Sequence, residues 1–300
     1  MSYEPSELVV TVRAGTPLAE LEAALAEKGQ CLPFEPPHFG EGATVGGMVA
    51  AGLSGPSRAS VGSVRDYVLG VSMVNGKGEQ LVFGGQVMKN VAGYDVSRLM
   101  AGSLGTLGLI TAVSIKVLGN APAEATLKFG CPQAEALAML HAWGGKPLPL
   151  QASRWTAEGG AETLFVRLRG AAAAVDAACK AMGGERQEGA AAAAGWSLAR
   201  ELRLPWFEAR GTRSLWRLSV AQTAPVLDLP EPPLVEWHGA QRWVRAAASD
   251  AAAIRREAAR GLANRPRIMV QRNSAGRGIS QASSPRISRS GSGRVKRSSM

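Results

Sequence analysis

Apolar residues in the first 118 positions follow spacings that predict short strands separated by helices and turns. The run Leu8–Val12 favours a strand, and Leu18, Leu21 and Leu25 then recur at helical spacing. Thr16-Pro17 would begin that helix and Gly29 would stop it. Further strands are expected at Tyr67–Val74, Glu79–Phe83 and Leu107–Leu118, with a hairpin turn at Asn75–Gly78 and a short helix capped by Asp95.

Beyond Gly119-Asn120-Ala121-Pro122 the pattern changes to an alanine-rich alternation of strands and helices. This alternation predicts an α+β domain in which helices cover one face of an antiparallel sheet. We place the domain boundaries at residues 1–122, 123–250 and 251–300. Strands are expected at Leu127–Gly130, Leu150–Thr156, Thr163–Arg169, Leu215–Ala221, Val235–His238 and Arg242–Ala247, and helices at Pro132–Trp143 and Ala171–Met182.

The net charge of +10 is concentrated at the C-terminal end. Residues 261–300 contain nine Lys and Arg and no Asp or Glu, so the other 25 basic residues nearly balance the 24 acidic ones. The main part of the chain therefore gives no electrostatic case for binding nucleic acid. The Arg-, Ser- and Gly-rich end has no apolar periodicity, which predicts a disordered basic tail; a nucleic-acid-binding arm is the alternative.

Cysteine and histidine usage argues against a metal centre in this chain. Cys31, Cys131 and Cys179 are far apart, and the three histidines, His38, His141 and His238, show no ligand spacing. An iron–sulfur cluster held by four thiolates cannot be built from three cysteines. No apolar run reaches the length of a membrane span, and no signal peptide opens the chain. We expect a cytoplasmic protein and leave open a peripheral position at the inner face of the cytoplasmic membrane.

Glycine is concentrated between Gly40 and Gly108, where it makes up 16 of 69 residues. These glycines alternate with Val, Met, Leu and Ala, so the segment is expected to be packed rather than flexible. Glycine lets a backbone N–H approach a ligand oxygen, and successive N–H groups can bind an anion. A helix starting near Thr44 would point its positive end to the same place. The pattern indicates a cofactor that carries phosphate and is held mainly by the main chain.

Three motifs in this segment, taken in order, resemble the second subdomain of the flavin-binding domain of the vanillyl-alcohol oxidase and p-cresol methylhydroxylase (PCMH) superfamily. They are Gly42–Gly47, Gly62–Gly70 and Gly102–Thr111. Two more segments, Glu35–Gly40 and Phe83–Asp95, are similar to the FAD-binding subunits of bacterial glycolate oxidases. The resemblance covers roughly residues 3–250 and implies an α+β fold: part of a PCMH-type FAD-binding domain followed by an α+β cap domain.

The resemblance also implies which residues contact FAD. Gly42, Ala43, Thr44, Gly46 and Gly47 would offer backbone N–H groups and a hydroxyl to the diphosphate or ribityl part. Lys89 could lie near the flavin ring, and His38 is a weak candidate for a base, so no catalytic residue is assigned. The expected cofactor-binding residues are Pro36, Pro37, Gly42, Ala43, Thr44, Gly46, Gly47, Gly62, Ser63, Asp66, Gly105, Thr106, Gly108 and Ile110.

The implied function is the FAD-dependent oxidation of glycolate, a small 2-hydroxy acid, to glyoxylate. The implied partners are a second flavoprotein subunit and an iron–sulfur subunit that receives the electrons. Relative to the family, the chain is expected to lack a first flavin subdomain before Met1, and its basic tail is expected to be out of frame. A flavin-free scaffold subunit of the same complex is the alternative.

Overall fold

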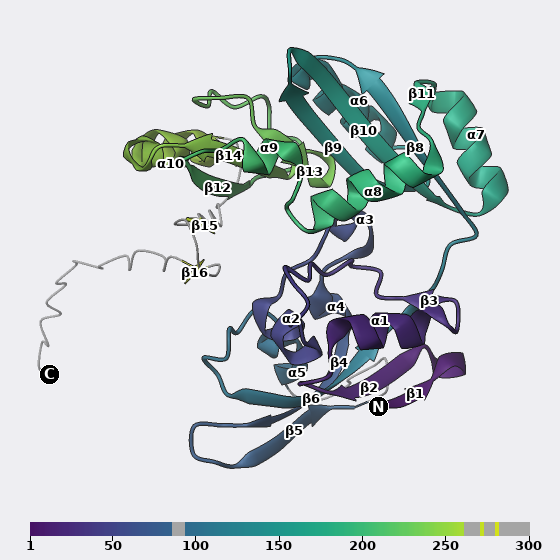
Figure 1. Cartoon of the computed structure of the whole chain (residues 1–300), viewed down its shortest axis with the longest axis vertical. Helices are drawn as coiled ribbons and strands as arrows, with labels where there is room; N and C mark the ends of the chain where they lie inside the picture. The colour runs from purple at the N-terminus through teal and green to yellow at the C-terminus, as the bar shows by residue number, and fades with distance from the viewer. Residues whose placement is uncertain (86–93, 261–270, 273–279, 282–300) are drawn as a thin grey trace, which may run out of the picture.

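An antiparallel sheet of five strands forms the base of the N-terminal domain (Figure 1). The structure is a computed structural model that describes residues 1–85 and 94–260, and the backbone of 271–272 and 280–281. The strand order is β1-β2-β6-β4-β5. The strands are β1 (Ser2–Glu4), β2 (Val9–Arg13), β4 (Val68–Val74), β5 (Gln80–Gly84) and β6 (Leu109–Lys116).

Helices α1 (Leu18–Ala26) and α2 (Val45–Ala51) pack on one face of this sheet. Leu18, Leu21 and Leu25 are fully buried, because helical spacing places all three on the side of α1 that faces the strands. The predicted leucine helix and the hairpin after Val74 are confirmed. The smaller elements of this domain are α3 (Arg58–Val61), α4 (Val64–Tyr67), α5 (Val96–Met100) and the ribbon of β3 (Gln30–Cys31) with β7 (Leu118–Gly119).

A second antiparallel sheet, of seven strands, forms the next domain. Its order is β11-β8-β10-β9-β13-β14-β12, so the central strands are contributed by chain segments far apart in sequence. The α+β class expected from the sequence is confirmed. The strands are β8 (Ala123–Gly130), β9 (Leu150–Glu158), β10 (Ala161–Gly170), β11 (Glu185–Arg186), β12 (Ser214–Ser219), β13 (Leu234–Glu236) and β14 (Gln241–Ala246).

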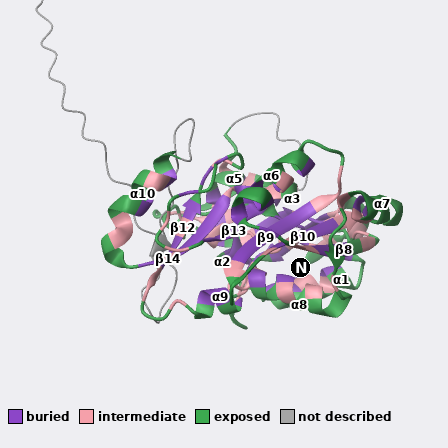
Figure 2. Ribbon diagram, turned by 90° about the horizontal axis from the view of Figure 1, so that it is seen from above, coloured by how far each residue is buried: buried purple, intermediate pink, exposed green. Residues whose placement is uncertain are grey.

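Helices cover both faces of the second sheet, whereas the sequence led us to expect them on one. The predicted helices α6 (Gln133–Gly144) and α7 (Ala172–Met182) pack on one face. Helix α8 (Gly189–Arg200), which was not predicted, and α9 (Pro205–Glu208) pack on the other through Trp196 and Trp206. Figure 2 shows the buried strands between these helices, whose outer sides are exposed. All seven tryptophans are buried in this domain, as expected for core residues.

The expected start of the disordered tail at residue 251 is wrong. Residues 251–260 form helix α10 (Ala251–Arg260), which buries Ile254 and Ala258 against Trp216 and Val244. Two apolar residues four positions apart fall on one helix face, and this is enough to anchor a short helix on the sheet.

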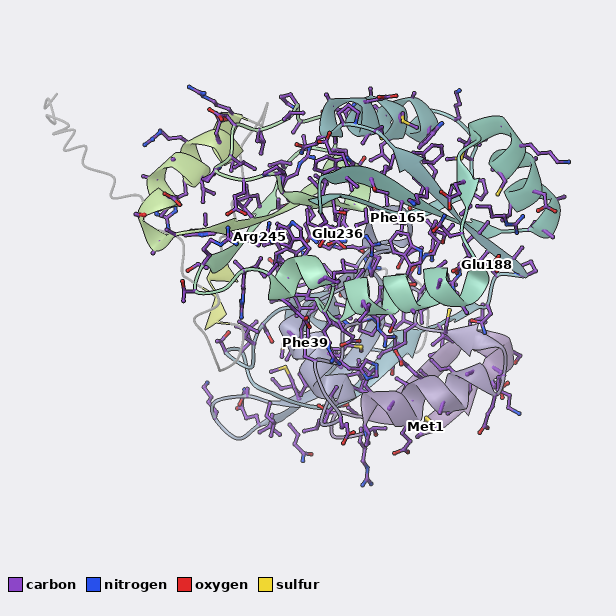
Figure 3. The ribbon with its side chains drawn as sticks, turned by 45° about the horizontal axis from the view of Figure 1, so that its top comes forward. Met1, Phe39, Phe165, Glu188, Glu236 and Arg245 are labelled. Carbon is purple, nitrogen blue, oxygen red and sulfur yellow. The ribbon has the colours of Figure 1, made fainter. Side chains whose placement is uncertain are left out.

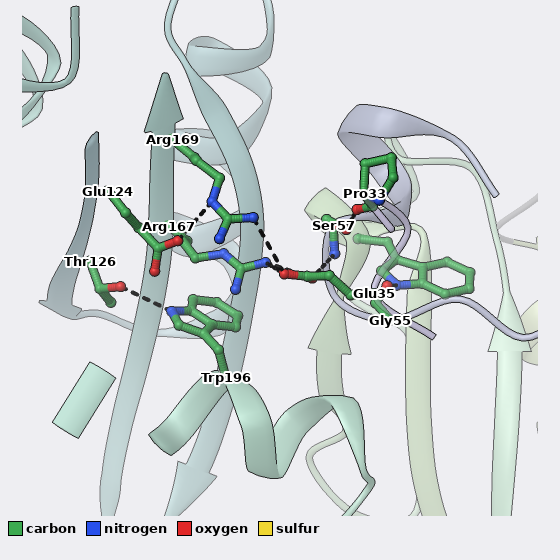
Figure 4. A network of polar contacts seen from close by, with 10 residues as sticks. Pro33, Glu35, Gly55, Ser57, Glu124, Thr126, Arg167, Arg169 and Trp196 are labelled. Carbon is green, nitrogen blue, oxygen red and sulfur yellow. Dashed lines mark hydrogen bonds and ion pairs between the residues drawn. The ribbon is translucent and has the colours of Figure 1, made fainter. Parts of the chain in front are cut away.

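A buried ion pair joins the two domains (Figure 4). Arg167 on β10 contacts both oxygens of Glu35 at 2.6 Å, and these side chains are only 5% and 17% exposed. Glu35 also accepts the backbone N–H of Ser57, so it ties the second sheet to two loops of the first domain. The indole N–H of Trp237 donates to the carbonyl of Gly55 at 3.1 Å. These polar contacts fix the position of one domain against the other.

Glu35→Gln is expected to lower the free energy of unfolding by about 2–4 kcal/mol, because it leaves a buried guanidinium without a full counter-charge. Urea denaturation measures this change. Glu185→Gln is the control, since Glu185 pairs with Lys128 at 3.6 Å but is 68% exposed, and it should cost less than about 1 kcal/mol. Equal losses in the two variants would contradict the assigned role of Glu35.

Candidate functional site

The glycine-rich loop before α2 is held by hydrogen bonds that use the first N–H groups of the helix. Val45 N–H donates to the Thr16 carbonyl at 3.0 Å, and Gly46 N–H donates to the Ala14 carbonyl at 2.7 Å. Gly47 N–H donates to the Thr44 hydroxyl, which caps the helix. The expected helix start at Thr44 is confirmed, but the expectation that Gly46 and Gly47 offer N–H groups to a ligand is wrong, because both donors already have acceptors.

Gly46 and Gly42 therefore serve different purposes. A Cβ on Gly46 would lie 2.5 Å from the Ala14 Cβ, so glycine is needed there for α2 to pack on the end of β2. A Cβ on Gly42 would meet nothing within 4 Å, and the residue is exposed. Within the described residues, the backbone N–H groups of Gly42, Ala43 and Thr44 have no acceptor. The donors that a ligand could use thus precede the helix.

The loop between α5 and β6 packs against the other end of α2. Gly102 N–H and Leu104 N–H donate to the carbonyls of Val49 and Ala50. Gly105 has φ +74° and faces open space, and the neighbouring Leu104 and Leu107 are nearly half exposed. This loop presents a small, apolar and solvent-facing surface at the C-terminal end of α2.

The remaining residues of the second and third motifs have internal structural roles. The Thr106 hydroxyl donates to the Ser103 carbonyl. A Cβ on Gly108 would lie 2.3 Å from the end of the Met73 side chain, and Ile110 is buried in the core. Asp66 accepts the backbone N–H and the hydroxyl of Ser63, just after Gly62, which closes the start of α4. The side chains of Thr106, Ile110 and Asp66 thus have protein contacts already.

The segment Pro36–Phe39 runs between the domains. Pro36 is buried, Pro37 and Phe39 line an interdomain cleft, and His38 lies 3.0 Å from the Glu22 carboxylate on α1. The backbone N–H groups of His38 and Phe39 donate to the carboxylate of Glu201, at the end of α8. Lys89 lies outside the described residues.

The floor of the cleft is the second sheet, which contributes Arg217, Glu236, Gln241 and Trp243. Phe39 of the first domain and Glu236 of the second domain both line the cleft, and Figure 3 shows them on either side of the domain boundary. Strand register explains why the polar residues of the cleft floor share one face of the sheet. Glu236 is paired with Arg154 on β9 and with Gln241 on β14. Arg217 on β12 is paired with Trp243 on β14. Sequence reasoning missed these residues because they become neighbours only through pairing between distant strands.

A buried carboxylate lies at the centre of this floor. Glu236 Oε2 accepts from the Gln241 amide and the Trp243 indole, both at 2.8 Å. Burial raises the pKa of Glu236, while these two hydrogen bonds and the charges of Arg154 and Arg217 act in the opposite direction. Burial also lowers the pKa of Arg217, and the nearby charge of Arg58 adds to this. The floor is therefore a desolvated group of charges with more cations than anions.

Comparison with known proteins identifies the fold and the family. An FAD binding domain family matches residues 1–84. The glycolate oxidase subunit GlcE of Escherichia coli is 47% identical over 250 residues, which are 83% of this chain and 69% of that protein. The chain belongs to the GlcE family. The proteins of this family are FAD-dependent oxidoreductases, and FAD is the cofactor of the present chain.

More distant matches agree with this family. The glycolate oxidase subunit GlcD of Bacillus subtilis is 32% identical over 127 residues, 42% of this chain and 27% of that protein. The solved structure of an alkyldihydroxyacetonephosphate synthase shares the fold, with a TM-score of 0.56 at 18% identity. The match covers 74% of this chain and 48% of that one, so the present chain spans about half of the synthase.

The open amides of residues 42–44 fit the diphosphate of FAD, because a phosphate needs several converging donors and no bulky side chain in its path. Metal ligands are a separate matter: the described residues contain no group of three His, Cys, Asp or Glu side chains that could hold an ion. In the same residues, no helix has the length and apolar character of a membrane span.

His238 bridges the domains beside the cleft and should make stability depend on pH. Its ring lies between the hydroxyls of Ser60 and Ser153, at 2.9 and 3.1 Å, and burial lowers its pKa from 6.5 to about 4. Below the unfolded pKa of 6.5, His238 is protonated in the unfolded chain but stays neutral in the folded chain. The folded state therefore loses stability as the pH falls from 6.5 toward 4.

We expect a loss of about 1–2 kcal/mol between about pH 7.5 and about pH 5 from this residue, after discounting for its partial exposure. His238→Asn should remove this part of the pH dependence, since asparagine tolerates the positive φ of +54° found there. Urea denaturation at both pH values measures it. If the variant and the wild type lose the same stability, His238 is not the titrating group.

Proposed function

We propose that this chain is the FAD-binding subunit of a glycolate oxidase complex, which oxidises glycolate or a related 2-hydroxy acid to the 2-oxo acid. The observation that carries the proposal is the turn at Gly42–Thr44 in a chain of the GlcE family, where three successive backbone N–H groups have no acceptor among the described residues and Gly42 is exposed. The identity of the relative, a glycolate oxidase subunit, supports the choice of substrate.

The bound FAD would supply a hydride acceptor for the carbon that bears the hydroxyl. The chain's own contribution begins with the amides of Gly42, Ala43 and Thr44, which would hold the diphosphate. The hydrogen bonds from Gly46 and Val45 to Ala14 and Thr16, in the turn after β2, keep this loop from shifting, so the donors stay in place without a ligand. Pro36, Pro37, Gly62, Ser63, Gly105 and Gly108 would shape the surrounding loops.

Electrons would leave the chain through partners. The sequence has three cysteines, fewer than the four thiolates of an iron–sulfur cluster, so we assign the cluster to an iron–sulfur subunit. The local likeness to GlcD supports a second flavoprotein subunit of related structure. All three cysteines are free, as is typical of a reducing compartment, and we place the complex in the cytoplasm or at the inner face of its membrane.

Gly42→Ala should weaken FAD binding about tenfold or more while leaving the fold intact, because the added methyl group faces open space that the cofactor would fill. Flavin absorbance retained through gel filtration and a flavin fluorescence titration measure the affinity. Gly76→Ala is the matched control, since its Cβ would also meet nothing, but in a hairpin turn away from the site.

Two outcomes would contradict the proposal. If the folded wild-type chain takes up no flavin in the presence of its partner subunits, it acts instead as a scaffold in the complex. If Gly42→Ala and Gly76→Ala bind FAD as tightly as the wild type, the diphosphate is held elsewhere.

A further inference from the structure

The segment that leads into the glycine-rich turn is held by a carboxylate of the second domain. The backbone N–H of His38 donates to Glu201 Oε2 at 3.0 Å, and the N–H of Phe39 donates to the same oxygen at 2.8 Å. Glu201 directly follows α8, and its side chain is 16% exposed. Arg200 donates to the other oxygen of this carboxylate at 2.8 Å. Two successive amides of the first domain are thus tied to one side chain of the second.

The backbone of this segment has a conformation that needs such a contact. Phe39 has φ +55° and Gly40 has φ +145°. A left-handed conformation at a residue with a bulky side chain is costly and persists only where the surroundings hold it. Pro36 and Pro37 have no N–H group, so the backbone donors that can tie this part of the segment begin at His38. Figure 3 shows Phe39 where the first domain meets the helices of the second.

The contact with Glu201 bears on the turn because little else fixes the near end of that turn. Residues 40–42 make no backbone hydrogen bond within the described part of the chain. The far end is fixed, since the carbonyl of Ala43 accepts the N–H of Leu18 at 2.8 Å. At most about 10 Å of chain separates Phe39 from Gly42. A shift of Phe39 therefore passes directly to Gly42, the first of the three open donors.

We propose that Glu201 is a positioning residue of the FAD site. By holding the amides of His38 and Phe39, it fixes the place of the turn at Gly42–Thr44, so the second domain controls how tightly the diphosphate is bound. This inference rests on the proposed function, because it concerns the same turn. The charge of Glu201 contributes as well as its reach, since an ionised acceptor forms a stronger hydrogen bond than a neutral one.

Hydrogen–deuterium exchange of the full chain with its partner subunits tests the contact itself. The fragment 36–40 reports it directly, because its two prolines carry no amide hydrogen. Glu201→Met keeps the length of the side chain but has no oxygen acceptor, and it should speed the exchange of this fragment about tenfold or more. Glu201→Gln keeps one oxygen and should speed the exchange about threefold. Glu188→Met and Glu188→Gln are the matched controls, since Glu188 is exposed at the other end of α8 and its side chain does not cap the helix.

A flavin fluorescence titration of the same variants tests the link to the cofactor. We expect Glu201→Met to weaken FAD binding about tenfold, and the Glu188 controls to leave it unchanged. A variant that only destabilises the fold would weaken FAD by the same factor in the wild-type and the Gly42→Ala backgrounds. A positioning residue acts through the turn, so in the Gly42→Ala background Glu201→Met should weaken FAD further by no more than about twofold.

Three results would overturn the inference and leave the proposed function standing. They are unchanged exchange of fragment 36–40 in Glu201→Met, an FAD affinity of Glu201→Met equal to that of the wild type, and a tenfold loss that recurs in full in the Gly42→Ala background. If Glu201→Met does not fold, Glu201→Gln carries the same comparisons with smaller expected changes. A wild-type chain that takes up no flavin with its partner subunits rejects the proposed function, and this role of Glu201 with it.

Discussion

The buried pair of Glu35 and Arg167 is the contact on which the candidate site depends. It draws a loop of the FAD-binding domain onto the second sheet, and Ser57 and Gly55 complete the joint. Only with this joint closed do Pro37 and Phe39 face Glu236 and Gln241 across one cleft. A buried ion pair contributes little net stability, but it penalises every arrangement that separates its partners. Its role here is to specify how the two domains fit together.

Local signals in the sequence were sufficient for many elements of the fold. The spacing of Leu18, Leu21 and Leu25, the Asn75-Gly76 turn and the Asp95 cap each act within a few residues, and each has the predicted structure. Helix α8 was missed because its alanine run has little apolar periodicity. It is held by long-range contacts, in which Trp196 packs under Arg167 and donates to Thr126, and the Gly195 carbonyl accepts from Arg154.

The candidate site shows the same division between local and long-range information. Sequence patterns located the glycine-rich turn but treated its glycines alike. The structure separates Gly46, which is needed for close packing on Ala14, from Gly42, which faces open space. The floor of the cleft could not be predicted at all, because Arg154, Glu236 and Gln241 lie on three strands that meet only through sheet pairing. No short sequence motif encodes a group of side chains that strand pairing brings together.

The charges of this floor act on the buried carboxylate of Glu236 in opposite directions. Burial favours the neutral form of Glu236, whereas the arginines and the two hydrogen bonds favour the charged form. The neighbouring arginines Arg154 and Arg217 therefore oppose the effect of burial on this carboxylate. Stacking of Arg58 on Trp237 and of Arg217 near Trp243 holds two of these charges at the wall. Glu236 in turn orients the Gln241 amide, whose NH₂ group donates to Glu236 Oε2.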